Sequence, residues 1–208
     1  MDQISREQAR NDAQVTCRPA APEDSRAIAA LICEAGGGLY EFLFDDLIPF
    51  MGAIDILAAG VSASGSPLSH QNCFVAADAS DRIVGAVNLF PADSMADDGF
   101  LPLVSDRFDH IRPILQLQDR GSMFLNAIAV ADSCRGKGIG TQLIDCAESR
   151  SLEAGLSRLS LHVWADNVAA VRLYKRLGFV EVGIAELAPS PRLLHRGGSL
   201  LMQKELRR

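Results

Sequence analysis

One glycine-rich and basic segment has a composition typical of an anion-binding turn: Arg135-Gly136-Lys137-Gly138-Ile139-Gly140-Thr141. Its small residues let the backbone approach a ligand closely and adopt positive φ angles. The run stands between a predicted strand and a predicted helix, and the first turn of a helix has unpaired N–H groups and a partial positive charge. With two basic side chains and the Thr141 hydroxyl, the run predicts a site for a phosphate or a pyrophosphate.

Two common phosphate motifs do not fit this run. A P-loop requires Ser or Thr after its lysine, but Gly138 follows Lys137. The dinucleotide fingerprint G-x-G-x-x-G requires its third glycine one residue later than Gly140. What remains is R-G-x-G-x-G after the apolar strand Ile128-Ala129-Val130. An enzyme that binds a nucleotide phosphate at the same turn stays as a rival interpretation.

The pattern resembles the signature of the GNAT superfamily of N-acetyltransferases, in which a strand and a short turn precede [RQ]-x-x-G-x-[GA] and a long helix. The segment Arg135 to Gly140 matches the signature at every defined position. A second block resembles the family's next strand and helix: His162-Val163-Trp164-Ala165-Asp166-Asn167, followed by Tyr174 and Gly178-Phe179. The resemblance is convincing from Phe124 to Gly183 and looser over most of Val15 to Lys204.

This resemblance implies an enzyme that moves an acetyl group from acetyl-CoA to a primary amine by direct attack in a ternary complex, without a metal. It also implies which residues hold CoA: Ile128, Ala129, Val130, Arg135, Gly136, Lys137, Gly138, Ile139, Gly140, Thr141, Asn167 and Tyr174. The N–H of Val130 has the family's position for stabilising the oxyanion. The phenol of Tyr174 has the position of the general acid for the departing thiolate, since an ordinary thiol has a pKa of about 8.5.

The general base is where the sequence departs from many relatives, which carry a Glu on the motif strand. The corresponding position here is Asn126, and a neutral amide cannot accept a proton. His162, Glu41 or a chain of waters are the substitutes. Alternatively, the amine loses its proton to solvent before it binds, and Asn126 orients the acceptor or a water. The missing carboxylate leaves a second function open, a CoA-binding sensor or regulatory module without turnover, although the presence of Tyr174 argues against it.

The elements predicted around these motifs alternate between strands and helices, as in a mixed α/β fold. Helices are predicted from Pro22 to Ala35, on both sides of Pro49, from Asp106 to Leu117, from Ile139 to Leu152 and after Asn167. Strands are predicted at Val15–Arg18, Phe74–Ala77, Ile83–Phe90, Met123–Val130, Leu159–Trp164, Glu181–Leu187 and Ser199–Lys204. The resemblance implies a twisted, mixed and mainly antiparallel sheet flanked by helices, with a splayed strand pair that holds CoA. We expect a polar tail over residues 1–14 and a single domain over residues 15–208.

Composition limits the partners and the compartment. The chain has 208 residues, 48% of them hydrophobic, and a net charge of −6, which argues against binding to nucleic acid. Its five cysteines are widely spread without C-x-x-C pairs, as in proteins of a reducing compartment. The polar N-terminus resembles no signal peptide, and no apolar run is long enough to cross a bilayer. We therefore expect a soluble cytoplasmic protein whose partners are acetyl-CoA and an amine, with no membrane; whether it forms a homodimer is left open.

The acidic residues of two loops have two interpretations. The simpler one is a solvated surface. The alternative is a lid that attracts a cationic amine. The residues concerned are Asp45, Asp46, Asp93, Asp97 and Asp98.

Overall fold

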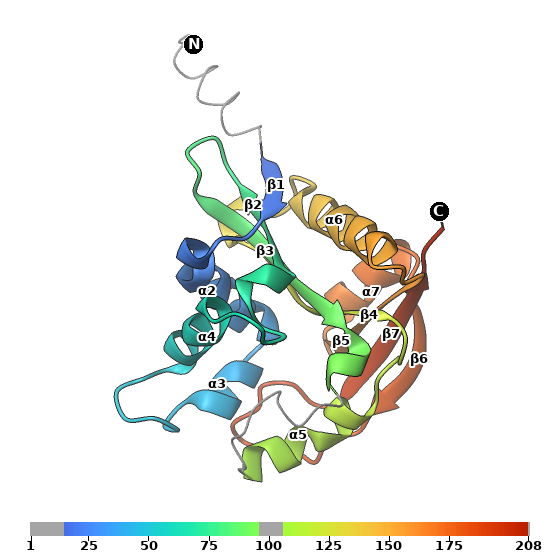
Figure 1. Cartoon of the computed structure of the whole chain (residues 1–208). Coiled ribbons are helices and arrows are strands. Elements are labelled where there is room, and N and C mark those ends of the chain that lie inside the picture. Colours follow the sequence, from blue (N-terminus) through green and yellow to red (C-terminus); the bar gives the residue numbers. More distant parts are fainter. Residues whose placement is uncertain (1–14, 96–105, 208) are drawn as a thin grey trace, which may run out of the picture.

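A computed structural model describes residues 15–95 and 106–207 of the chain (Figure 1). The expected polar tail at residues 1–14 lies outside the described residues. The same is true of most of the loop predicted between Pro91 and Leu103, including Asp97 and Asp98.

Seven strands form one sheet in the order β1-β2-β3-β4-β5-β7-β6. Every neighbouring pair is antiparallel except β4 and β5, which run parallel. The prediction of a mixed, mainly antiparallel sheet is confirmed. A single sheet that takes in strands from both ends of the described chain supports the expectation of one domain, which stays a prediction. The strands are β1 Thr16–Pro19, β2 Cys73–Ala77, β3 Ile83–Pro91, β4 Met123–Val130, β5 Arg158–Trp164, β6 Val180–Ala185 and β7 Ser199–Glu205.

Helices cover both faces of the sheet (Figure 1). On one face α2, α3, α4 and α5 pack around Ile28, Phe44 and Leu57, and on the other α6 packs over Leu143, Leu159 and Met202. Burial of these apolar side chains is the main driving force for both layers. The helices are α2 Ser25–Gly36, α3 Leu39–Phe44, α4 Ala53–Ser62, α5 Asp106–Gln116, α6 Ile139–Glu153 and α7 Val168–Arg176, with short 3-10 turns at Pro22–Asp24, His70–Asn72, Ala92–Met95 and Asp132–Cys134.

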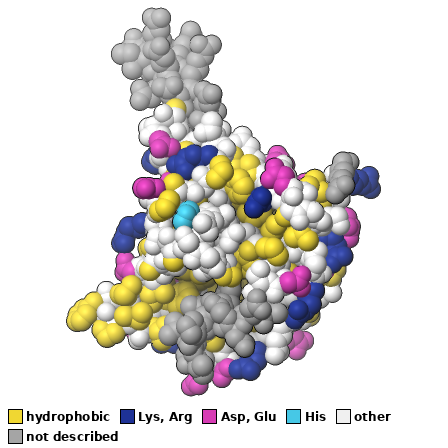
Figure 2. All heavy atoms as spheres, in the orientation of Figure 1, with side chains coloured by type: hydrophobic (Ala, Val, Ile, Leu, Met, Phe, Trp, Pro, Cys, Tyr) yellow, Lys and Arg dark blue, Asp and Glu magenta, His cyan; other side chains and the backbone are white. Residues whose placement is uncertain are grey.

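The connection between α3 and α4 projects from the body of the molecule. It contains Pro49, where the sequence predicted a break between two helices, and this break is confirmed. Phe50 in this connection is fully exposed, and Figure 2 shows apolar side chains gathered on this projection. Among the described residues, no helix is long and apolar enough to span a membrane.

The two central strands separate halfway along their length. β4 pairs with β5 only from Met123 to Leu125, opposite Leu159 to Leu161. Beyond that point β4 continues along β3, and β5 continues along β7. A gap therefore opens in the sheet at Asn126 and His162. The predicted splayed strand pair is confirmed, and the gap places an unpaired strand edge inside the molecule.

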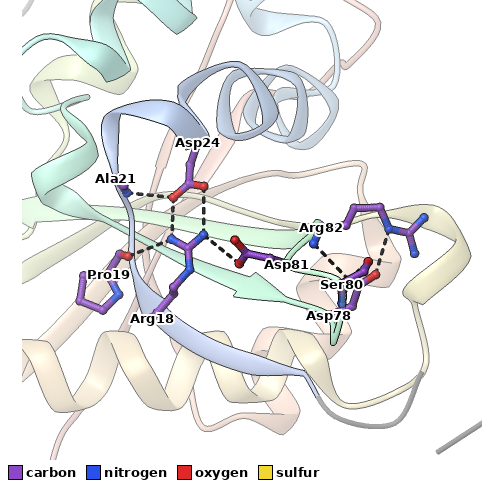
Figure 3. A network of polar contacts seen from close by, with 8 residues as sticks. All are labelled: Arg18, Pro19, Ala21, Asp24, Asp78, Ser80, Asp81 and Arg82. Carbon is purple, nitrogen blue, oxygen red and sulfur yellow. Dashed lines mark hydrogen bonds and ion pairs between the residues drawn. The ribbon is translucent and has the colours of Figure 1, made fainter. Parts of the chain in front are cut away.

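An ion-pair network fastens β1 to the turn before α2 (Figure 3). Arg18 donates to both carboxylate oxygens of Asp24, at 2.7 and 3.1 Å, and to Asp81 on the β2–β3 turn at 3.3 Å. Asp24 also accepts the N–H of Ala21 at 2.8 Å. The side chain of Asp24 is only 9% exposed, whereas that of Asp81 is 79% exposed. The bond from Arg18 holds the pKa of the Asp24 carboxyl below its ordinary value.

We predict that Asp24→Asn lowers the free energy of unfolding by about 1–3 kcal/mol, because a part-buried guanidinium loses its charged partner. Urea denaturation measures the change. Because pairing lowers the pKa of Asp24, its contribution is present above the pKa of the unfolded carboxyl, about 4, and is lost as the pH falls through the lower folded value. The difference from the wild type should therefore shrink below about pH 4. Asp81→Asn is the control: water screens this exposed pair, so a loss as large as that of Asp24→Asn would contradict the analysis.

Candidate functional site

The gap between β4 and β5 is continuous with a cavity of about 860 Å³. The wall of this cavity is formed by β4, α3, α5, the first turn of α6 and one face of α7. Of the residues predicted for the site, Lys137 and the alternative base Glu41 do not line it, whereas the others do, namely Asn126, Ile128, Ala129, Val130, Arg135, Gly136, Gly138, Ile139, Gly140, Thr141, His162, Asn167 and Tyr174. The structure thus gathers a set that spans 49 positions of the sequence, from Asn126 to Tyr174, around one space.

The glycine turn exposes its backbone at one end of this cavity. Gly136 and Gly138 have φ angles of 76° and 82°, a left-handed conformation that favours glycine. A Cβ added at either residue would meet no atom within 4 Å. In the described part of the chain, no acceptor bonds to the amide N–H groups of residues 136–141. Six consecutive amides at the start of α6 are therefore free to bind an anion.

Arg135 fastens this turn to the rest of the fold. Its Nε donates to the carbonyl of Val130 at 3.1 Å, and its guanidinium forms ion pairs with Glu34 on α2 and with Asp132. Its charge is thus shared with two carboxylates. A second arginine, Arg176 on α7, also lines the cavity. Arg176 was not predicted from the sequence, although a cation two residues after Tyr174 on an amphipathic helix is a usable signal.

The free edge of β4 faces the gap. The N–H of Ala131 donates to the carbonyl of Val84 on β3 at 2.9 Å. Because successive N–H groups of a strand point to opposite edges, those of Ile128 and Val130 point away from β3. The bond from Arg135 to the carbonyl of Val130 agrees with this orientation. This edge can therefore form hydrogen bonds with the amides of a peptide-like ligand.

Two residues of α7 border the other side of the gap. Asn167 caps the helix, with its side-chain oxygen accepting the N–H of Ala170 at 3.2 Å. Tyr174 lies about two turns further along the same side of the helix and packs edge-on against Phe179, with ring centroids 5.6 Å apart. Its hydroxyl forms no hydrogen bond within the described part of the chain. Burial raises the pKa of Tyr174 to about 12, so the phenol keeps its proton at neutral pH.

His162 faces the cavity with both of its ring nitrogens occupied. Nε2 lies 2.8 Å from the carbonyl of Leu117 and must carry the proton, since a carbonyl only accepts. Nδ1 lies 3.2 Å from the hydroxyl of Ser199. Burial lowers the pKa of His162, which favours the neutral ring. The base role of His162 stays a prediction and would act through the Ser199 hydroxyl.

The other candidates for proton transfer or charge attraction lie elsewhere. Glu41 is not among the residues that line the cavity, and its Oε2 is buried without a hydrogen-bond partner in the described region. Asp93 lies near Arg120 and accepts the N–H of Gly121. Asp46 forms an ion pair with Arg192. None of these three carboxylates faces the gap.

Comparisons with known proteins identify the family. The model of the acetyltransferase (GNAT) family matches residues 54–179. The chain is similar to an uncharacterized N-acetyltransferase, YdgE, of Bacillus subtilis, with 32% identity over 33% of this chain and 43% of that protein. It is also similar to the mycothiol acetyltransferase of Corynebacterium jeikeium, with 42% identity over 25% of this chain and 15% of that protein. The matches thus span less than half the length of these curated relatives.

Solved structures agree on the fold. One, described as an acetyltransferase, superposes with a TM-score of 0.67 at 22% identity and covers 92% of this chain and 100% of its own. An N-acetyltransferase from Staphylococcus aureus Mu50 has a TM-score of 0.66 at 20% identity and covers 90% and 99%. The chain belongs to the acetyltransferase (GNAT) family.

We predict that Asn167→Ala lowers the free energy of unfolding by about 1 kcal/mol, because α7 loses its side-chain cap. Thermal or urea unfolding measures this change. Asn167→Ser is the matched control, since its hydroxyl can accept the same N–H bond. Equal losses in the two variants would show that the cap contributes nothing.

Proposed function

We propose that the protein transfers an acetyl group from acetyl-CoA to a primary amine by direct attack in a ternary complex. One observation carries the proposal: the free amides of residues 136–141 stand at one end of a cavity whose wall is the unpaired edge of β4. A diphosphate needs the first feature, and the amide-containing pantetheine arm needs the second. The residues present therefore fit CoA.

Acetyl-CoA, when bound, supplies the acetyl group as a thioester. In the proposed complex, residues 136–141 bind the diphosphate, and Ile128, Ala129 and Val130 pair with the pantetheine arm. Thr141 and Asn167 add side-chain contacts. Lys137 lies outside the cavity wall, so we assign it only a longer-range attraction for the anion.

The reaction forms a C–N bond and breaks a C–S bond, while the amine loses one proton and the sulfur gains one. The N–H of Val130 points into the gap and stabilises negative charge on the carbonyl oxygen. The phenol of Tyr174, which is protonated and has no partner among the described residues, donates to the sulfur. With a pKa of about 12 it is a weaker acid than a thiol in water, so hydrogen bonding to the thiolate supplies much of the effect.

The amine proton has two routes. In one, Nδ1 of His162 removes it through the Ser199 hydroxyl. In the other, the amine binds in its neutral form and loses its second proton to water, while Asn126 orients it. The low pKa of His162 weakens the first route, because a buried imidazole resists becoming a cation. A cytoplasmic location stays a prediction of the sequence, and whether the protein forms a homodimer stays open.

We predict that Gly138→Val weakens CoA binding about tenfold or more, because its side chain projects into the open space beside the free amides. Titration calorimetry with CoA measures the affinity. Gly155→Val is the matched control: Gly155 has a φ of 77°, also with no atom within 4 Å of an added Cβ, and it lies outside the cavity wall. Both variants carry the same left-handed strain, so equal CoA affinities would refute the anion site.

We predict that Tyr174→Phe lowers kcat about 100-fold and leaves the affinity for CoA nearly unchanged, because only the proton donor is removed. Thiol release during incubation with acetyl-CoA and an amine panel measures kcat. Because the pKa of Tyr174 is raised, the acid form persists, and wild-type kcat should show no decline up to about pH 10. Unchanged turnover in the variant would refute the acid role. CoA binding by the wild type without any acylated product would indicate a sensor.

A further inference from the structure

The end of the cavity opposite the glycine turn is apolar. Its wall consists of buried side chains from α3, α5 and the first half of β4, and we call it the apolar arm: Tyr40, Phe44, Ile111, Ile114 and Phe124. The ring centroids of Tyr40 and Phe44 are 6.3 Å apart with the rings nearly parallel. Such a wall favours an aromatic or hydrocarbon group.

The charged groups of the cavity lie away from this arm. Among the described residues that line the cavity, the charged ones are Glu34, Arg135 and Arg176, and the carboxylate of Glu34 is paired with Arg135. An ammonium ion placed in the apolar arm would lose its hydration without gaining a counter-charge from any described residue of the wall, which is unfavourable.

One polar side chain, that of Asn126, stands where the apolar arm meets the gap. Its orientation can be deduced from its neighbour Asn88. Asn88 on β3 is completely buried, with its Nδ2 lying 3.1 Å from the carbonyl of Pro67 and 3.2 Å from that of Asn72. Two carbonyls can only accept, so the NH₂ group of Asn88 must face them and its Oδ1 must face Asn126. Nδ2 of Asn126 donates to that oxygen at 2.9 Å.

The second hydrogen of the Asn126 amide is also engaged, because Nδ2 lies 3.4 Å from the hydroxyl of Tyr40. Only Oδ1 of Asn126 remains. No donor of the described chain reaches it, and it is not among the buried unpaired atoms, so it is open to the cavity that Asn126 lines. The network therefore presents a carbonyl oxygen, a hydrogen-bond acceptor without charge, at the entrance to the apolar arm.

We propose that the acetyl acceptor is an uncharged amine on an aromatic or hydrocarbon body, and that Asn88 is a positioning residue that turns Oδ1 of Asn126 toward its N–H. This inference rests on the proposed function and names its substrate class. The apolar body fills the arm, and one N–H bonds to Asn126 while the nitrogen lone pair stays free for attack. An extended acyl chain could also fill the arm, but it would leave Oδ1 without a donor.

Binding without turnover tests the substrate class. The probes are 1-naphthylamine, a weak base, and 1-naphthylmethylamine, a cation at neutral pH, each titrated by fluorescence into the protein with and without CoA. We expect wild type to bind 1-naphthylamine at least fivefold more tightly than the cation. Asn126→Leu should weaken 1-naphthylamine binding about fivefold, the value of one neutral hydrogen bond, and leave CoA affinity unchanged. Asn126→Asp should shift the preference toward the cation.

The result that overturns the proposal is tighter binding of the cation by wild type, or equal 1-naphthylamine binding by wild type and Asn126→Leu. CoA affinity is measured separately, so failure of the wild type to bind CoA contradicts the proposed function. The probe titration still decides whether the apolar arm prefers the neutral amine or the cation. A third titration uses octanoyl-CoA. If octanoyl-CoA binds more tightly than acetyl-CoA and displaces 1-naphthylamine, the apolar arm holds an acyl chain, and the proposal is wrong.

The role of Asn88 is tested by a double-mutant cycle, which separates positioning from general stability. Asn88→Leu should weaken 1-naphthylamine binding in wild type but have no further effect in Asn126→Leu, since it acts only through that amide. Asn88→Ser, which keeps a hydroxyl for one carbonyl, serves if Asn88→Leu does not fold. Additive losses would refute the positioning role.

Discussion

The separation of β4 from β5 after Leu125 is the constraint on which the site depends. A strand that loses its neighbour inside a protein leaves peptide N–H and C=O groups without partners, and such groups are costly to bury. Here the gap is continuous with a cavity of about 860 Å³, so the peptide N–H and C=O groups of Ile128 and Val130 face the cavity and can still form hydrogen bonds. The fold thus leaves one strand edge of the sheet unpaired, and this edge is able to form hydrogen bonds with a ligand that has peptide-like amides.

The same logic holds at the start of α6. Helix N-termini always leave several amides unpaired, and most proteins satisfy them with a capping side chain. Gly138 stands at the cap position and offers no side chain. α7 shows the contrast, because Asn167 caps its first turn. Two helices that border one cavity therefore begin differently: α6 has no side-chain cap, whereas a side chain caps α7.

Much of the fold was predictable because its signals are local. The strand at Met123–Val130 has the predicted bounds, and the break near Pro49 follows from the missing N–H of proline. β6 was less well placed: it begins one residue earlier and ends two residues earlier than predicted, at Val180 and Ala185. Alternation of apolar residues in β6 does not mark its ends, since most of this edge strand is exposed on both faces.

The candidate site was predictable only in part. The glycine turn carries its own signal, since the turn requires residues without side chains. Tyr40 carries none, because it meets Asn126 across 86 positions of the sequence. In the sequence, Asn88 is only a polar residue within an apolar strand. Its partners Pro67 and Asn72 lie in a connection without a periodic pattern, so no signal in the sequence predicts these contacts. Contacts of this kind depend on the assembled fold and not on local pattern.

The buried amide of Asn88 has a consequence for which hydrogen bonds the cavity offers. Its orientation is dictated by two main-chain carbonyls in the segment that links α4 to β2, which are absent from the cavity wall. Remodelling that connection would let the amide of Asn88 rotate, and the NH₂ group of Asn126, a hydrogen-bond donor, would then face the cavity in place of its oxygen, an acceptor. A substitution in the segment between α4 and β2 that moves these two carbonyls would therefore alter hydrogen bonding in the cavity without touching Asn126.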